Sequence, residues 1–347
     1  MTTKRSWFGI LSILTVFALL LGACTTQPTA TAEPSAPAVS ETEAPAPEPG
    51  VKAPAETKIA LVQFLKGHPV HRLMQLGFSE ACKAGGYQCE LLLTDSTSPV
   101  DMIPLAEQAL AEPVDGVVLY AVDDSFFPTI AKFNAAGIPV VTPHFTSFDQ
   151  AASGLTAVVG ADVVAYAKAA AEAMGAKLEG KGSVAVTVGS FNQTENLVAE
   201  TFKATMAEKY PDITVLDPQE EGFDAAQAIS KAVAIIQGNP DISGAFSTTG
   251  NGPTTWSNAA AEVSSDIVII SMDYTRQNLD LVKEGKVYGL VAQPLYEEFY
   301  ASVELVAKAI NGEAIEYLNL LPAPVIMEAD LESYYGFNDR AEALIDQ

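Results

Sequence analysis

Short apolar segments alternate with longer amphipathic segments along most of this chain, and this alternation limits the possible folds more than any other feature. The apolar segment KIALVQF (58–64) is followed by residues 70–82, whose apolar side chains recur with the spacing of a helix. Short, wholly apolar strands between helices are typical of parallel sheets that helices cover on both faces. We therefore predict an α/β protein made of parallel strands and crossover helices.

The alternation occurs in two series, and the second begins after the segment TAVVGAD (156–162). The first series predicts strands over 58–64, 89–95, 115–122 and 138–145, with helices over 70–82, 100–112 and 126–136. The second predicts strands over 183–189, 213–217, 244–250, 266–273 and 287–294, with helices over 163–178, 195–209, 224–237, 253–263 and 275–284. About 290 residues from Thr57 onward are too many for one typical core. With right-handed crossovers, we expect two similar doubly wound lobes, each a mainly parallel three-layer α/β/α sandwich.

The N-terminus has the features of an export signal. Lys4 and Arg5 precede an apolar run over 7–21 that is too short for a dependable membrane span. The run ends in LGAC (21–24), which resembles the lipobox of bacterial lipoproteins. This resemblance implies a signal peptide over 1–23 and a lipid on Cys24, where stable anchoring needs more than one acyl chain. The alternative is an ordinary secretory signal followed by a chance cysteine.

The segment after the predicted cleavage site, residues 24–56, is dominated by Thr, Ala, Pro and Glu. Such a composition cannot bury enough apolar surface to offset the entropy of ordering. We interpret this segment as a disordered, extended tether. The folded part of the chain is then expected outside the cytoplasmic membrane, held to it through Cys24.

The chain is strongly acidic, with 43 Asp and Glu against 19 Lys and Arg and a net charge of -24. A surface of this charge repels nucleic acid and anionic lipid headgroups. No nucleic-acid partner is therefore expected.

Two cysteines follow Cys24, at positions 82 and 89. Outside the cell, Cys82 and Cys89 could form a disulfide. Both also fall on predicted buried faces, where a cysteine often serves as a small hydrophobic residue. The sequence leaves these alternatives open.

All three histidines of the chain, His68, His71 and His144, come just after predicted strands. In open α/β sheets, ligands bind beyond the carboxyl ends of the strands. We therefore expect the three histidines to line a cleft, although any one of them could instead be a solvated or capping residue.

The segments KIALVQF, DGVVLYAVDDS, GIPVVTPHF, IISMDYT and VAQPL, in this order and spacing, resemble type I periplasmic binding proteins. Within that family the chain is similar to the ribose-binding-protein group of sugar receptors for ABC importers, over about residues 58–321. The resemblance implies a solute clamped between two lobes, which a three-crossing hinge joins. We place the crossings over 158–162, 293–295 and 322–325. The N-terminal lobe is then 57–158 plus 295–322, and the C-terminal lobe is 159–294 plus 323–347.

The resemblance also implies binding residues at positions that match the family motifs. Asp273 in SMDYT matches the aspartate that accepts hydrogen bonds from sugar hydroxyls, and Gln293 in VAQP matches a binding glutamine. Phe223 in EEGFD matches an aromatic residue of the second lobe. Alternatively, the three are a helix cap, a strand-end amide and a core side chain.

Elsewhere the sequence departs from the sugar-receptor pattern. The segment His68-Pro69-Val70-His71 replaces Asn-Pro-Phe-Phe, and His144-Phe145 replaces an Asp-Arg pair. The fold and clamp therefore carry over, but ribose as the ligand does not. Neutral histidines still offer one donor and one acceptor each to a polyol. The remaining candidate ligand residues are Asn196 and Thr249, at positions of a family arginine and asparagine, and Tyr120, with Phe145, Phe223 and Trp256 as further apolar faces.

The expected function is capture of a small polyhydroxylated solute, a sugar, by a monomeric receptor that delivers it to an ABC importer permease. Motifs of common enzymes such as Gly-x-Ser-x-Gly and His-Glu-x-x-His are missing from the sequence, so we expect no catalytic residues and no cofactor. Two alternatives concern the solute: a nucleoside-type compound, or a metal held by His68, His71, His144 and Asp273. A third is a receptor that serves a membrane signalling protein rather than an importer.

Overall fold

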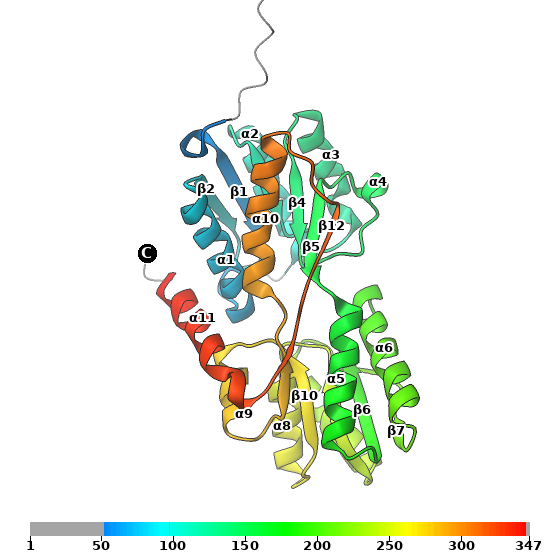
Figure 1. Ribbon diagram of the computed structural model, residues 1–347. Coiled ribbons are helices and arrows are strands. Elements are labelled where there is room, and N and C mark those ends of the chain that lie inside the picture. Colours follow the sequence, from blue (N-terminus) through cyan, green and yellow to red (C-terminus); the bar gives the residue numbers. More distant parts are fainter. Residues whose placement is uncertain (1–51, 97, 345–347) are drawn as a thin grey trace, which may run out of the picture. The chain divides into compact units, whose positions relative to one another are not determined.

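The computed structural model describes residues 52–96 and 98–344. The predicted signal peptide, Cys24 and most of the predicted tether lie outside these residues. The described chain forms two lobes, each with a central sheet and helices on both faces (Figure 1). The prediction of two mainly parallel three-layer lobes is confirmed.

Lobe one surrounds a six-stranded sheet with the order β12-β5-β4-β3-β1-β2, in which every neighbouring pair is parallel. Its strands are β1 (Lys58–Gln63), β2 (Gln88–Leu93), β3 (Gly116–Leu119), β4 (Val140–Pro143), β5 (Ala157–Ala161) and β12 (Leu318–Leu321). Its helices are α1 (Pro69–Gly85), α2 (Ile103–Ala111), α3 (Phe127–Ala135), α4 (Gln150–Ser153) and α10 (Leu295–Ile310), with 3-10 turns over Pro54–Glu56, Pro99–Met102 and Asp124–Phe126.

Lobe two is built on a seven-stranded sheet, in which six strands follow the order β13-β11-β10-β9-β6-β7. The seventh, β8, pairs with the carboxyl end of β6, whose amino end pairs with β7. Only β13 runs antiparallel to its neighbour among the described strands. The strands are β6 (Gly182–Val188), β7 (Ile213–Val215), β8 (Gln219–Glu220), β9 (Ile242–Ser247), β10 (Val268–Met272), β11 (Gly289–Val291) and β13 (Val325–Ile326). The helices are α5 (Val163–Lys177), α6 (Gln193–Lys209), α7 (Ala225–Gly238), α8 (Gly252–Glu262), α9 (Arg276–Lys283) and α11 (Leu331–Ala343), with a 3-10 turn over Glu328–Asp330.

The chain passes between the sheets three times, from β5 to α5, from β11 to α10 and from β12 to β13. Each passage is short, and the passages bond to one another: the Asp162 N–H donates to the Leu321 carbonyl, and the Ala292 N–H donates to the Pro324 carbonyl. The Asp162 carboxylate accepts a hydrogen bond from the Ala165 N–H and so caps α5. In the second passage, the Gln293 N–H donates to the Val291 carbonyl. The carboxyl ends of both sheets therefore lie beside these connections, where sequence reasoning places the binding residues.

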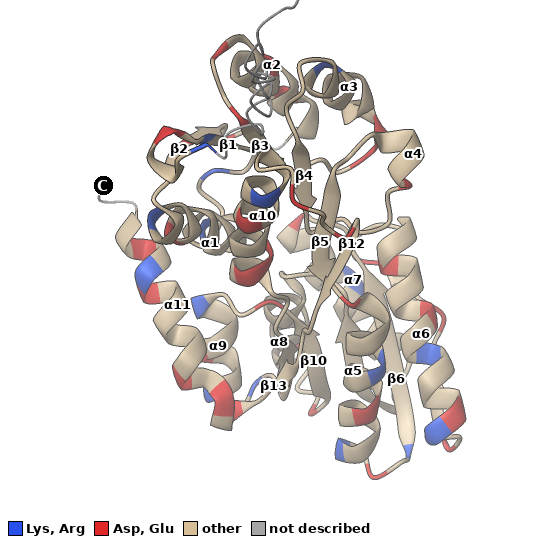
Figure 2. Cartoon of the chain, turned by 45° about the horizontal axis from the view of Figure 1, so that its top comes forward, with Lys and Arg blue, Asp and Glu red and all other residues tan. Residues whose placement is uncertain are grey.

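Apolar strands form the centre of each lobe, as their composition predicts. Ile59, Leu61 and Val118 are fully buried in lobe one, and Phe246 and Ile270 are fully buried in lobe two. Acidic residues are spread over the helices of both lobes, as Figure 2 shows. This division between an apolar interior and a charged surface is what burial of apolar area predicts.

Helices α1 and α10 pack closely on one face of the first sheet, and a glycine makes this possible. A Cβ atom added to Gly77 in α1 would lie 2.0 Å from the backbone carbonyl oxygen of Tyr296 in α10. Their contact continues at the Tyr296 hydroxyl, which donates to the Glu80 carboxylate over 2.6 Å. The first turn of α10 is therefore held in place by α1.

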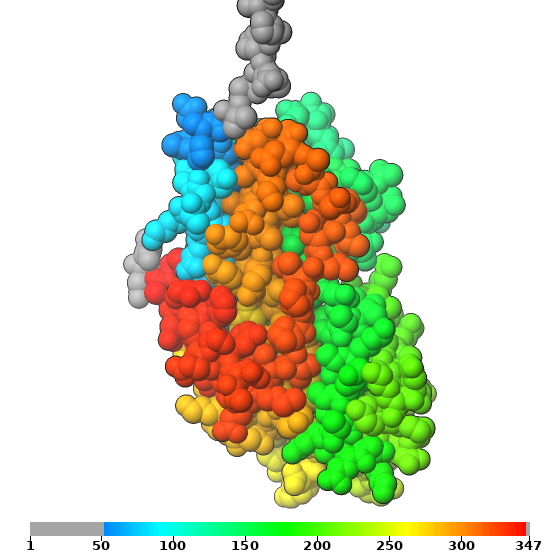
Figure 3. Space-filling model, viewed as in Figure 1, coloured from blue at the N-terminus to red at the C-terminus, as the bar shows by residue number. Residues whose placement is uncertain are grey.

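The last helix, α11, contacts both lobes. On lobe two, Arg276 of α9 pairs with Glu342 and Asp339 of α11, and the Asn338 side chain accepts the Arg276 N–H. On lobe one, Arg340 pairs with Glu80 of α1 at 3.1 Å. Figure 3 shows this red C-terminal segment in contact with the cyan atoms of lobe one.

Two details differ from the sequence predictions or were left open by them. The predicted tether ends too late, because Lys52 pairs with Asp115 at 2.6 Å and the Gln88 amide donates to the Ala55 carbonyl. Cys82 and Cys89 are joined by a disulfide, which links the end of α1 to the start of β2.

In the described part of the chain, no helix combines the length and the apolar character that crossing a bilayer demands.

Candidate functional site

The three histidines come together around Tyr120. The ring of Tyr120 lies 5.2 Å from His71 and 5.8 Å from His144, and His68 lies 5.7 Å from His71. Phe64 packs against both Tyr120 and His71. This grouping follows from the topology, because Phe64, Tyr120 and His144 directly follow β1, β3 and β4, which are neighbours in one parallel sheet.

His144 is held by a carboxylate that the sequence analysis did not identify. Its Nδ1 atom lies 2.9 Å from Oε1 of Glu298, which is fully buried. The second oxygen of Glu298, Oε2, has no hydrogen-bond partner. Helix α10 was not predicted, so an acidic residue in its first turn gave no reason to expect burial. The available signal was the Glu297-Glu298 pair, which begins three residues after Pro294.

Asp273 provides the corresponding acidic group of lobe two. It follows β10 and is 6% exposed, and its Oδ1 atom has no hydrogen-bond partner. Gly250 leaves room for the carboxylate, since a Cβ there would lie 2.4 Å from Asp273 Oδ2. Asp273 lies close enough to His144 and Glu298 for their charges to shift its pKa. The Tyr296 N–H donates to the Tyr274 hydroxyl over 3.4 Å, so the segment that carries Asp273 lies against the first turn of α10, which carries Glu298.

Burial and mutual charge set the protonation of this group. The pKa of Asp273 is raised to about 7, chiefly by burial, with His144 opposing the shift and the charge of Glu298 adding to it. Burial also raises the pKa of Glu298, against the effect of His144. Burial lowers the pKa of His144, but Glu298 and Asp273 outweigh it, so that pKa is raised. Burial lowers the pKa of His71 to about 3, so His71 is neutral.

His144 of lobe one and Asp273 of lobe two both have strained backbones. His144 has a φ of 73° and Asp273 a φ of 69°, in the left-handed region that favours glycine. Gly160 in β5 permits this path, because a Cβ there would lie 2.9 Å from the His144 carbonyl oxygen. Residues other than glycine persist in this conformation where the surrounding structure enforces it, and such residues cluster at functional sites.

A buried network lies beneath the site in lobe two. The Glu221 carboxylate is 1% exposed and accepts hydrogen bonds from the hydroxyls of Thr187, Ser247 and Thr249. Thr249 therefore already uses its hydroxyl within the protein. Trp256, which the sequence analysis offered as an apolar face for the solute, is fully buried and donates to Thr187. That expectation was wrong, because the indole belongs to the interior of lobe two.

The other predicted binding residues lie at different depths. Phe145 is half-buried against Tyr120, with ring centroids 5.1 Å apart. Gln293 is half-buried in the second passage, where it interacts with the Tyr166 hydroxyl. Phe223 is 66% exposed, and its ring covers Gly189. Asn196 is half-buried in the first turn of α6.

A cavity of about 630 Å³ opens between the lobes, next to the histidine segment. On lobe one it is lined by Gly67, Pro69 and Arg72, which flank His68 and His71. On lobe two it is lined by α9 and the end of α11, starting at Thr275, two residues after Asp273. In the parts of the chain with assigned positions, no three His, Cys, Asp or Glu side chains are grouped as metal ligands.

The pKa of Asp273 predicts how stability depends on pH. Because the folded-state value of about 7 exceeds the ordinary 3.8, the folded protein holds a proton that the unfolded chain has released between these pH values. Stability from this group is therefore greatest below about pH 4 and falls as the pH rises to about 7, by on the order of 4 kcal/mol. Asp273→Asn should lose this part of the pH dependence. Denaturant titrations of both proteins across this range measure it, and parallel stability curves would contradict the prediction.

Comparison with known proteins places the chain in a family. A model of the periplasmic binding protein domain matches residues 59–314, about three quarters of the chain. The chain belongs to this family. It is a type I periplasmic binding protein of the ribose-binding-protein-like group, as the sequence resemblance predicts.

Individual periplasmic binding proteins are similar over most of their length. The ribose import binding protein RbsB of Bacillus subtilis (strain 168) is 24% identical over 321 residues, which are 91% of this chain and 97% of that protein. A sugar-binding protein of a sugar ABC transporter from Bacillus halodurans is 24% identical with a TM-score of 0.73, covering 80% of this chain and 100% of its own. A solute binding protein of an ABC transporter from Actinobacillus succinogenes 130z, with bound D-allose, is 22% identical with a TM-score of 0.73 and covers 80% and 100%.

Proposed function

We propose that this protein captures a small polyhydroxylated solute, a sugar, between its lobes outside the cytoplasmic membrane and delivers it to an ABC importer. One observation supports this most directly. Buried polar atoms without hydrogen-bond partners come from both lobes to one junction: His71 Nδ1 and Glu298 Oε2 from lobe one, and Asp273 Oδ1 from lobe two. Unsatisfied buried polar atoms cost about 1–3 kcal/mol each, so a solute that satisfies all three joins the lobes.

The chemistry of the junction suits a sugar. Carboxylate oxygens accept hydrogen bonds from hydroxyl groups, and a neutral histidine offers one donor and one acceptor. The rings of Tyr120 and Phe145 offer apolar faces to the carbon skeleton. One similar solved protein holds D-allose, and one relative is named for ribose import. In this proposal Asp273 and Gln293 bind hydroxyls, and the exposed Phe223 covers the solute from lobe two.

Delivery is proposed to depend on movement of the lobes about the three passages. Contacts to both lobes stabilise the closed state, because the solute has a different free energy of interaction with each conformation. The importer then binds the outer surface of the closed protein. We further propose that a lipid on Cys24 holds the protein at the membrane, which the loss of detergent-phase partitioning in Cys24→Ser would support.

The proposal predicts that a sugar both stabilises and compacts the protein. A thermal-shift screen of monosaccharides, polyols, nucleosides and divalent cations on the purified chain identifies the solute, since a ligand at 100 times its Kd adds about 2.7 kcal/mol. Small-angle scattering with that solute at saturation should then show a smaller radius of gyration. A nucleoside or metal as the only stabilising ligand, or a sugar that binds without compaction, would contradict the proposal.

A further inference from the structure

Two buried carboxylates at the junction of the lobes each retain an oxygen that no donor satisfies. Asp273 is 6% exposed with a free Oδ1, and Glu298 is fully buried with a free Oε2. The two lie on segments in direct contact, because the hydroxyl of Tyr274, next in sequence to Asp273, accepts a hydrogen bond over 3.4 Å from the Tyr296 N–H, two residues before Glu298. Anions buried in this way are stable only when they are protonated, hydrogen-bonded or paired with a cation.

The other two acids of the site already have donors. Glu221 accepts from three hydroxyls, and Glu195 accepts from the Gly189 N–H and the Thr248 hydroxyl. They do not depend on a solute for their hydrogen bonds. They nevertheless add negative charge to lobe two, since Glu195 raises the pKa of Glu221 and of Tyr166.

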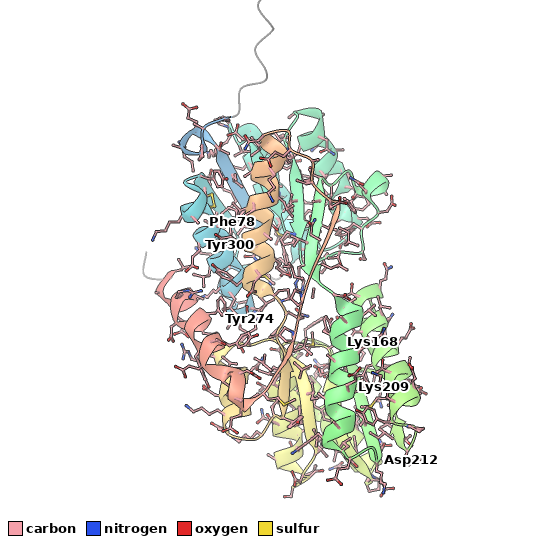
Figure 4. All side chains as sticks on the ribbon, in the orientation of Figure 1. Phe78, Lys168, Lys209, Asp212, Tyr274 and Tyr300 are labelled. Atoms are coloured by element: carbon pink, nitrogen blue, oxygen red, sulfur yellow. A yellow bond between two sulfur atoms is a disulfide. The ribbon has the colours of Figure 1, made fainter. Side chains whose placement is uncertain are left out.

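Among the described residues, the cationic side chain that pairs with one of these acids is a histidine. His144 is bound to Oε1 of Glu298 and leaves Oε2 free. Of the lysines and arginines whose positions are described, none forms an ion pair with Asp273, Glu298, Glu195 or Glu221. Lys231 reaches only the backbone carbonyls of Glu220 and Glu221. Lys168 and Lys209 lie on the outer helices α5 and α6, whereas Tyr274 marks the junction (Figure 4).

From this arrangement we propose that the solute carries a protonated amine: it is an amino sugar or an amino polyol. This inference rests on the proposed function and adds the charge of the ligand to it. An ammonium group has three donors and a full positive charge, so it can satisfy Asp273 Oδ1 and Glu298 Oε2 together. A neutral hydroxyl has a single donor and leaves the charge of one acid unbalanced. Sugar acids are disfavoured, because their carboxylate would meet two buried acids that pair with no described lysine or arginine.

Matched pairs of sugars test the inference by isothermal titration calorimetry on the full chain. D-glucose, D-galactose and D-allose are compared with their 2-amino-2-deoxy and 6-amino-6-deoxy derivatives, at a pH where the amines are protonated. At least one amine should bind about tenfold or more tighter than its parent, as expected for charge-assisted hydrogen bonds. The N-acetyl derivative of that amine, which keeps the nitrogen but loses the charge, should lose the advantage.

Variants then locate the preference. Asp273→Asn and Glu298→Gln should each reduce the ratio of amine to parent affinity to within about threefold. Glu304→Gln, an exposed acid further along the same helix, should leave the ratio unchanged. If the parent sugars bind as tightly as every amine, the inference is overturned while sugar binding stands. If neither parents nor amines bind, the proposed function itself fails.

Discussion

Replacing Asp273 with alanine is expected to weaken binding of the solute by about a hundredfold or more while leaving the fold intact. Above pH 7, where Asp273 with its pKa of about 7 is ionised, hydrogen bonds to this charged acceptor are worth roughly 1.5–3 kcal/mol each, and 1.4 kcal/mol corresponds to a factor of ten. The Asp273 carboxylate is buried with a free oxygen, so two such bonds to the solute account for the loss. Titration calorimetry with the sugar that gives the largest thermal shift measures the effect.

The same strand offers a matched control. Asp266 lies just before β10, at its opposite end, and is exposed. Asp266→Ala should bind normally, and Gln293→Ala, which loses neutral hydrogen bonds, should bind about tenfold more weakly. Normal binding by Asp273→Ala would refute the transfer of this position from the sugar receptors.

Introducing valine at Gly77 is expected to destabilise the protein by about 3 kcal/mol or more. A single Cβ there would already lie 2.0 Å from a backbone oxygen of α10, which cannot move away as a flexible side chain could. Overpacking of this kind typically costs about 1–3 kcal/mol, and the branched side chain adds to it. Denaturant unfolding gives the change in free energy directly.

The displacement should also reach the candidate site. The clashing carbonyl belongs to Tyr296, two residues before Glu298. Gly77→Ala, the milder change, should therefore weaken solute binding as well as stability, because it shifts Glu298 relative to His144. Gly336→Ala in α11 is the control, since its added Cβ meets nothing within 4 Å. That change should raise stability by roughly 0.5–1 kcal/mol, as glycine is a poor helix former. Equal losses in both variants would show that the α1–α10 contact is not the cause.

Sequence patterns predicted nine strands and most helices because burial on both faces leaves a distinctive apolar run, but they missed β5, β8, β12 and β13. They were less accurate at strand ends. Strand β11 was predicted over 287–294 but covers Gly289–Val291, because the next residues leave the sheet for lobe one. Helices α10 and α11 were not predicted, although their residues had been assigned to lobes. For α10 the local signal was present, since Leu295, Phe299, Val303 and Val306 recur with helical spacing and are buried.

The candidate site, too, could be predicted only in part from the sequence. The positions of the histidines and Asp273 follow from the rule that ligands bind at the carboxyl ends of parallel strands. Glu298 could not be found by that rule, because it comes from a helix rather than from a strand end. The interaction of His144 with Glu298, and the burial of Trp256, depend on contacts between segments distant in the sequence. Such contacts appear only once the chain is folded.

The order of segments in the chain has a consequence for how the protein is made. Helix α10 and edge strand β12 of the first sheet are translated only after strands β6 to β11 of the second. Until then, strands β3, β4 and β5 lack the helix that covers one of their faces. Uncovered apolar strands are prone to aggregate during synthesis. A stop codon anywhere before residue 318 leaves both sheets incomplete, so truncation of the gene yields neither lobe intact.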